Sequence, residues 1–119
     1  MSRTRTNPDY LNGVPELLIL HLLSRRPMYG YEIVRAIEES TEQALEFGEG
    51  CIYPVLHRLE AGGSLASRRE LVGGRSRVVY RVTPAGKKKL VQSENHWRAI
   101  VAAVEKVLRG EEHERPALA

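Results

Sequence analysis

The sequence predicts a mainly α-helical domain with a small β-hairpin, followed by a long C-terminal helix. Two patterns predict this fold class. Apolar residues recur with helical spacing in three segments between residues 15 and 61, and then alternate with polar residues in two short segments after residue 64. From residue 84 onward, apolar residues return at alternating spacings of three and four, which is typical of a helix that pairs with another helix.

Length and composition narrow the class of protein. A chain of 119 residues suits one domain, and 42% hydrophobic with 28% charged residues argues against disordered and disulfide-dense chains. The longest apolar stretch, residues 17–23, already contains His21 and is far shorter than the roughly 20 residues that cross a bilayer. No apolar stretch follows the basic start, and the single Cys51 suits a reducing compartment. We therefore expect a cytoplasmic protein with no membrane partner.

The positive charge is concentrated in one segment. The net charge of the chain is +3, but residues 57–89 contain nine Lys or Arg against two Asp or Glu, a net charge of +7. Residues 1–56 carry a net charge of −3, and residues 90–119 carry −1. Such a segment favours a polyanion such as nucleic acid as its partner, although a solvated basic surface would have the same composition.

The first two helices follow from apolar spacing and from prolines. The first is predicted over residues 15–25, with Pro15 in its first turn. Its apolar residues nearly encircle the helix axis, so it should be deeply buried. Pro27 ends this helix, because the residue before a proline leaves the α region. The second helix is predicted over residues 30–40, with its apolar residues on one face.

A third helix is predicted over residues 51–61. Its apolar residues fall at i, i+3, i+4 and i+7 from Ile52, which is an amphipathic pattern. Pro54 lies in the first turn, where its missing N–H costs little. Gly62 and Gly63 should close the helix with a left-handed cap.

Two strands and a last helix complete the predicted order. The strands are expected over residues 65–72 and 78–82, joined by a glycine turn that carries Arg75. Thr83 and Pro84 then form a helix start, with the threonine as the N-cap and the proline at the first helical position. This helix should reach about residue 109.

The last helix carries a heptad-like seam of mostly apolar residues. On a monomer this seam would be an exposed apolar stripe, so it predicts a homodimer held by the last helix. The predicted interface residues are Leu90, Trp97, Val101, Val104 and Leu108, with Glu94 at the remaining position of the repeat.

This order of elements is that of a winged helix-turn-helix. In that motif the third helix enters the major groove of DNA, and the arginines of the hairpin reach the backbone or the minor groove. The chain then divides into a flexible N-terminal arm (1–12), a DNA-binding domain (13–83), a dimerisation helix (84–110) and a flexible tail (111–119). The predicted DNA contacts are Tyr53, Pro54, His57 and Arg58 on the third helix, and Arg68, Arg75 and Arg77 on the hairpin.

Four blocks of sequence and one tryptophan are also those of a known family. The blocks are LILHLL at 18–23, PMYGYEI at 27–33, GCIYPVLHRLE at 50–60 and GRSRVVYRVTPAG at 74–86, and the tryptophan is Trp97. In these blocks the chain resembles the PadR-type transcriptional regulators, over about residues 11–108. The family's usual Gly-Thr-Leu-Tyr reads Gly-Cys-Ile-Tyr in residues 50–53.

The resemblance implies a dimeric, DNA-binding repressor that responds to small molecules and has the single C-terminal helix of the short-form members. It places one of the two tyrosines that flank Gly30 near the DNA backbone, and the predicted DNA contacts also include Tyr31 and Cys51. In those members the first and last helices build the dimer, and the tryptophan lines a pocket there that accepts flat aromatic compounds in some cases. The pocket predicted for a planar aromatic effector comprises Trp97, Leu18, Glu94 and Val101.

Several alternatives stay open. Trp97 is either plain dimer core or a platform for a ligand. The basic hairpin would also suit a winged-helix adaptor that binds an acidic protein partner. At least one of Arg68 and Arg69 is expected to be merely solvated, and Cys51 is either an oxidant-sensing thiol or a small residue at a helix start.

Enzyme chemistry has little support in the sequence. No catalytic set of residues stands out, the histidines lack the spacing of metal ligands, and no glycine-rich phosphate loop follows a strand. We therefore expect no enzymatic activity, no cofactor and no metal.

Overall fold

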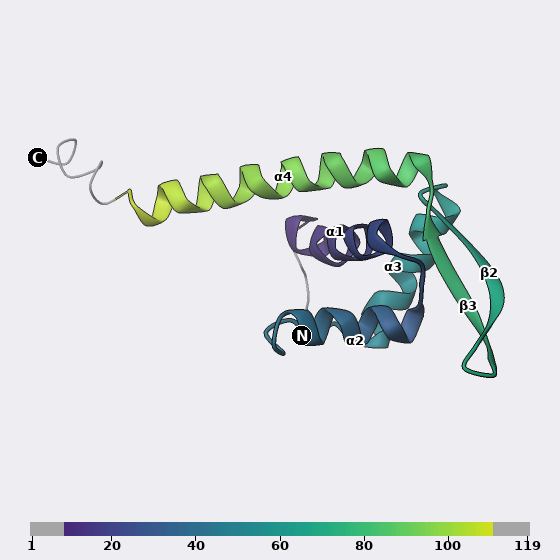
Figure 1. Ribbon diagram of the computed structural model, residues 1–119. Coiled ribbons are helices and arrows are strands. Elements are labelled where there is room, and N and C mark those ends of the chain that lie inside the picture. The colour runs from purple at the N-terminus through teal and green to yellow at the C-terminus, as the bar shows by residue number, and fades with distance from the viewer. Residues whose placement is uncertain (1–8, 111–119) are drawn as a thin grey trace, which may run out of the picture.

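The computed structural model describes residues 9–110, with side-chain burial from residue 13 onward. The predicted C-terminal tail and the first eight residues of the predicted arm lie outside the described residues. The described part contains these elements in order: α1 (Asp9–Arg25), β1 (Met28–Tyr29), α2 (Gly30–Ser40), α3 (Glu49–Ala61), β2 (Leu65–Val72), β3 (Arg75–Val82) and α4 (Pro84–Leu108) (Figure 1). The mainly helical fold with a small sheet and a long last helix is thus confirmed.

Helix α1 begins earlier than the sequence predicts. Residues 9–12, which we assigned to the arm, belong to this helix, and Pro15 lies inside it rather than in its first turn. A proline removes one backbone hydrogen bond from a helix interior. Here the Pro15 ring is buried, and α1 continues on both sides of it.

The sheet has three antiparallel strands in the order β1-β3-β2, one more than the predicted hairpin. The additional strand, β1, pairs Met28 with Tyr80 and Tyr29 with Val79. Two residues are too few to show an alternating pattern, so the sequence could not reveal β1. Strand β3 begins at Arg75 rather than at residue 78, because its pairing with β2 continues to the glycine turn.

The core lies between α1, α2, α3 and the sheet. Helix α1 contacts α4 as well as α2, α3 and β3, which explains why its apolar residues encircle it. Figure 1 shows α4 running alongside α1 and then extending beyond the helical body. The most deeply buried side chains are Ile19, Leu20, Ile33, Ile52 and Leu56.

The end of α3 is joined closely to the start of α4. Gly63 has a φ of +86°, which confirms the left-handed conformation expected after α3. Thr83 caps α4 as predicted: its Oγ1 accepts a hydrogen bond from the Gly86 N–H at 3.0 Å. The same hydroxyl donates to the Gly63 carbonyl at 2.6 Å, and the Thr83 N–H donates to the Ser64 carbonyl at 3.0 Å. These bonds tie the first turn of α4 to the loop that follows α3.

Candidate nucleic-acid interface

Helix α3 is buried on one side and open on the other. Its buried side chains are Ile52, Val55, Leu56 and Leu59. At about 100° per residue, Pro54 and His57 lie opposite this side, and both are exposed. These two residues are therefore on the side of α3 that is accessible to a partner.

Tyr53 lies on the flank of α3 that faces the sheet. Its ring packs over Gly30, at the start of α2, so closely that a Cβ at Gly30 would overlap it. Burial raises the pKa of the Tyr53 hydroxyl; Glu49 also raises this pKa, and Arg77 lowers it. The hydroxyl is therefore protonated at neutral pH and can donate a hydrogen bond.

Arg58 lies on the opposite flank, beside α1. Its Nη2 is 3.5 Å from Oε1 of Glu16, whose Oε2 is 3.6 Å from Nζ of Lys89 on α4. The Arg58 side chain is 58% exposed, and Lys89 stays beside the half-buried Glu16 when Arg58 leaves, so we expect this long pair to contribute only about 0–1 kcal/mol. Arg58 can therefore leave Glu16 for a phosphate or a base at little cost. Cys51 is exposed at the start of the same helix.

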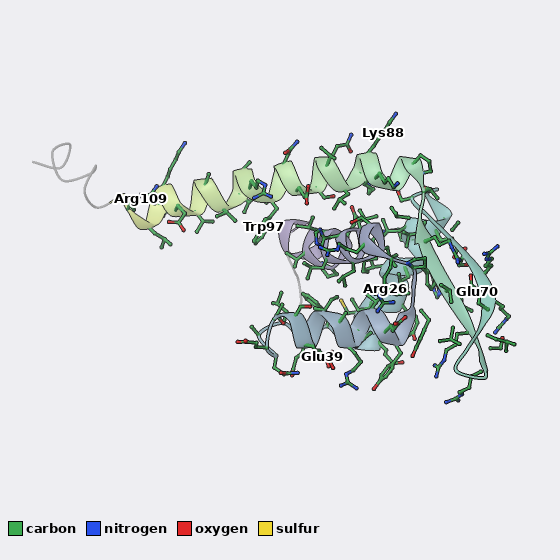
Figure 2. All side chains as sticks on the ribbon, in the orientation of Figure 1. Arg26, Glu39, Glu70, Lys88, Trp97 and Arg109 are labelled. Atoms are coloured by element: carbon green, nitrogen blue, oxygen red, sulfur yellow. The ribbon has the colours of Figure 1, made fainter. Side chains whose placement is uncertain are left out.

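Two arginines of the sheet are bound to one carboxylate. Arg68 and Arg81 lie 3.0 Å and 2.6 Å from Oε2 of Glu70. Figure 2 shows Glu70 on the side of the sheet away from the helices. Hydrogen bonds from Arg68 and then from Arg81 lower the pKa of Glu70. Arg68, a predicted DNA contact, is thus engaged with Glu70 in the isolated protomer.

Arg77, another predicted DNA contact, is stacked on an aromatic ring. Its guanidinium carbon lies 4.4 Å from the centroid of the Tyr29 ring, and its Nε is buried without a hydrogen-bond partner among the described residues. Tyr29 belongs to β1 and directly precedes α2, and Arg77 belongs to β3. This contact therefore connects the start of α2 to the hairpin.

The remaining predicted contacts are exposed. Arg75 follows Gly73 and Gly74, whose φ values of +58° and +81° confirm a glycine turn. Arg75 forms no ion pair with any residue in the described range. Tyr31, on the outer side of α2, accepts a hydrogen bond from Arg35 at 3.4 Å.

A hollow of about 300 Å³ separates α3 from the hairpin. It brings the predicted contacts Tyr53, His57 and Arg77 together, whereas Arg58, Arg68 and Arg75 lie outside it. The other six lining residues were not predicted as contacts: Tyr29, Gly30, Arg69, Ser76, Val78 and Tyr80. A signal for Arg69 was present in the alternation of β2, because Arg69 shares a face with Leu65 and Ser67.

A second cavity, of about 240 Å³, lies between α1 and α4. Of the four predicted effector-pocket residues, it contains only Trp97, which Figure 2 shows near the N-terminal end of α1. Leu18 instead lines a separate hollow between α1 and α2, because it is turned about 100° from Leu17. Glu94 and Val101 do not line the cavity. Its lining is Gly13, Val14, Glu16, Leu17, Lys89, Gln92, Ser93, His96, Trp97 and Ile100.

The predicted dimer seam falls into two parts. Leu90 is half-buried against the core of its own protomer, and Glu94 is half-buried as well. Trp97 and Val101 are 39% and 37% exposed, and Val104 and Leu108 are 50% and 71% exposed. Helix α4 is therefore covered by α1 at its beginning and uncovered toward its end.

Within residues 9–110, no three His, Cys, Asp or Glu side chains gather as a metal site would require. Over the same range, no helix combines the length and the apolar character needed to cross a membrane.

Comparison with known proteins identifies a family. Residues 19–92 match the family described as "Transcriptional regulator PadR-like family". The chain is 34% identical over 105 residues to Transcriptional regulator Rv3488 of Mycobacterium tuberculosis, covering 88% of this chain and 92% of that protein. A transcriptional regulator from Clostridium thermocellum, 30% identical, has a similar structure with a TM-score of 0.76, covering 83% of this chain and 97% of the other.

A structure of Bacillus subtilis PadR in complex with operator DNA is also similar. It is 29% identical, with a TM-score of 0.60, and the match covers 66% of this chain and 45% of the other. The family match spans more than half of the chain, and the chain has the same fold as these solved structures. The chain therefore belongs to the PadR-like family of transcriptional regulators.

Proposed function

We propose that the protein is a DNA-binding repressor that acts as a homodimer on an inverted-repeat operator. The observation that carries this proposal is the juxtaposition of the open side of α3 with a basic hairpin, across a hollow lined by Tyr53, His57 and Arg69. The operator complex of the similar Bacillus subtilis PadR supports duplex DNA as the partner.

The proposed contacts differ in what they read. Helix α3 enters the major groove, where His57 and Arg58 reach base edges, while Arg75 at the hairpin turn contacts the backbone or the minor groove. In a dimer, two α3 helices lie about 34 Å apart and enter successive major grooves on one face of the duplex.

Genomic footprinting tests this function, with the region upstream of the chain's own gene examined first. We expect protection of an inverted repeat, with half-sites about one helical turn apart, and affinity that falls steeply with salt. A chain that acts instead as an adaptor for an acidic protein would show no preference for one DNA sequence. Equal affinity for all duplexes would therefore contradict the proposal.

The homodimer rests on the uncovered end of α4. Val101, Val104, Val107 and Leu108 are all exposed there. Burial of apolar surface contributes about 25 cal/mol per Å², so the same residues of a second copy are the simplest cover for this stripe. In this arrangement α4 of each protomer forms the interface.

Effector control rests on the cavity between α1 and α4. We propose that a planar aromatic compound binds there against Trp97, with Ser93 and His96 as polar neighbours. Helix α4 is hydrogen-bonded through Thr83 to the end of α3. A ligand that changes the position of α4 would thereby change the spacing of the two α3 helices and lower DNA affinity. Coupling of this kind is typically 1–3 kcal/mol.

A further inference from the structure

The hollow between α3 and the hairpin has a positively charged lining. It contains Arg69 and Arg77, and none of the described residues that line it is acidic. The cavity between α1 and α4 contains Glu16 as well as Lys89. The hollow between α1 and α2 also contains two arginines, Arg25 and Arg26, but no residue of α3 or of the hairpin lines it. The hollow beside α3 is thus suited to an anion.

We propose that this hollow binds one phosphate of the DNA backbone and that Arg69 is its principal ligand. The proposal rests on the DNA binding proposed above and adds a site to it. Arg69 was not among the DNA contacts predicted from the sequence. Arg68 and Arg77 were predicted, but in the structure both are engaged with other side chains, so they are less available to a phosphate than Arg69.

The first step is which arginines of the hairpin are available. Arg68 and Arg81 are bound to Glu70, and Arg77 is stacked on Tyr29. Arg69 makes a long hydrogen bond, in which its Nη1 donates to Oγ of Ser76 at 3.5 Å. The Arg69 guanidinium is exposed and can turn toward a phosphate with little loss.

The second step is the face of the sheet from which Arg69 projects. In the β2–β3 ladder, Arg69 is opposite Val78 and alternates in direction with Arg68. Ser67, two residues earlier and on the same face, donates a hydrogen bond from its Oγ to Glu60 of α3 at 2.6 Å. This face is therefore turned toward α3, and Arg69 lies across the hollow from the open side of that helix.

The third step is the set of donors. Ser76 and Tyr53, each of which carries a hydroxyl, line the same hollow as Arg69. Phosphate oxygens accept hydrogen bonds from all of these groups, and an arginine can bind two of the oxygens at once. The hollow has room for a phosphate group with several waters, because one water occupies about 30 Å³.

The fourth step is why the phosphate belongs to a duplex. When α3 lies in the major groove and the hairpin reaches the minor groove, the strand that separates the two grooves passes between them. The hollow lies between these two elements. A phosphodiester of that strand would lie at this position. Free phosphate has the same hydrogen-bonding groups, but it is not held there by α3 and the hairpin in the two grooves.

Salt titrations of DNA binding test the site. We compare Arg69→Ala with the matched control Arg68→Ala, which removes the same charge from the neighbouring position on the opposite face. Each phosphate contact contributes about 0.9 to the slope of log K against log salt. We expect Arg69→Ala to reduce the slope by about 2 per dimer, so that the loss of affinity between 50 and 200 mM salt becomes about 12-fold smaller. Arg68→Ala should change the slope by less than half as much.

Two further arms distinguish the possible outcomes. With an operator in which single phosphates are replaced by methylphosphonate, one position should weaken the wild type and leave Arg69→Ala unchanged. Arg69→Lys should keep the slope, because its charge remains. Equal slopes for the wild type and Arg69→Ala, or equal effects of the two alanine variants, would overturn the site while leaving DNA binding intact. A wild type that binds no duplex would instead refute the proposed function.

Inorganic phosphate supplies the last arm, followed through the Arg69 Nε–H signal in NMR spectra of the full chain. We expect millimolar phosphate to leave this signal nearly unchanged and operator DNA to shift it. A strong shift with phosphate, combined with normal operator affinity of Arg69→Ala, would make the hollow a site for free anions and overturn the proposal.

Discussion

At the scale of single residues, the structure separates arginines that the sequence presents as equivalent. Arg68, Arg75 and Arg77 were all predicted as DNA contacts, because each is a cation on the hairpin. The structure engages Arg68 with Glu70, stacks Arg77 on Tyr29 and leaves Arg75 exposed. Period-two alternation along a strand indicates which residues share a face, but it does not indicate their neighbours on that face, since the neighbours come from other elements.

The contact between Tyr29 and Arg77 should stabilise the fold by an amount that a double-mutant cycle can measure. We expect a coupling free energy of about 0.5–1 kcal/mol between Tyr29→Leu and Arg77→Gln in urea unfolding. Tyr29→Phe is the matched control, because it keeps the ring and should keep the coupling. A coupling free energy near zero would mean that the guanidinium and the ring are merely adjacent.

Arg58 should carry sequence information. Arg58→Ala is expected to weaken binding to the operator by about 1–3 kcal/mol if Arg58 contacts a guanine, and to weaken binding to unrelated duplexes much less. The measurement is the dissociation constant on both kinds of DNA at one salt concentration. Glu16→Gln removes the ion-pair partner and is the control: operator binding should change by no more than about 1 kcal/mol. Equal losses on the two kinds of DNA would reduce Arg58 to a backbone contact.

At the scale of elements, the junction between α3 and α4 is built on a close approach that requires glycine. A Cβ at Gly86 would overlap the carbonyl oxygen of Ser64, and a backbone atom cannot turn aside as a side chain can. Gly86→Ala should therefore destabilise the protein by about 1–3 kcal/mol in urea unfolding. Gly50→Ala is the matched control, since nothing lies within 4 Å of a Cβ there. That control should be neutral or stabilise by up to about 1 kcal/mol.

Most elements could be predicted because each has a local cause. Apolar spacing predicted the bounds of α2, alternation predicted those of β2, and the Thr83-Pro84 pair predicted the cap of α4. The structure confirms all three. The start of α1 was wrong, because burial of Pro15 by other parts of the chain outweighed its preference for a first turn. Strand β1 was missed, because it exists only through its pairing with β3. The cavity beside Trp97 likewise depends on how α1 packs against α4, so its lining could not be obtained from the seam alone.

At the scale of the whole molecule, the uncovered end of α4 should hold two protomers together. Changing Val101 and Leu108 together to Glu would place two charges on the proposed interface. We expect monomers in sedimentation velocity and a large loss of operator affinity, because two half-sites would no longer be bound jointly. Glu105→Gln with Lys106→Gln is a control that alters charge on the same turns of α4 without charging the apolar stripe. A Val101→Glu, Leu108→Glu variant that stays dimeric would place the interface elsewhere.

A planar aromatic compound that binds beside Trp97 should also weaken operator binding by the dimer, and the fluorescence of Trp97 can be used to follow its binding. Trp97 is the one tryptophan of the chain, so quenching of tryptophan fluorescence reports on this site alone. The dimer can adopt one arrangement of its protomers that fits the operator and another that fits it poorly. A ligand lowers DNA affinity only by the factor by which it binds the second arrangement more tightly than the first. We therefore expect compounds that quench Trp97 to weaken operator binding by about 5–150-fold, which corresponds to the usual 1–3 kcal/mol.

Two variants decide whether the cavity or the interface is responsible. Ser93→Leu fills the cavity from α4 and should abolish quenching, whereas Ala99→Leu, on an exposed position of the same helix that does not line it, should leave quenching unchanged. Trp97→Leu should retain DNA binding and lose the response to the compound. If no compound quenches the fluorescence, and Trp97→Leu makes the dimer more stable with DNA binding intact, then Trp97 is dimer core. The part of Trp97 that is exposed in the single protomer would then be covered by the second protomer. The dimer would become more stable in Trp97→Leu because leucine packs better than tryptophan between paired helices.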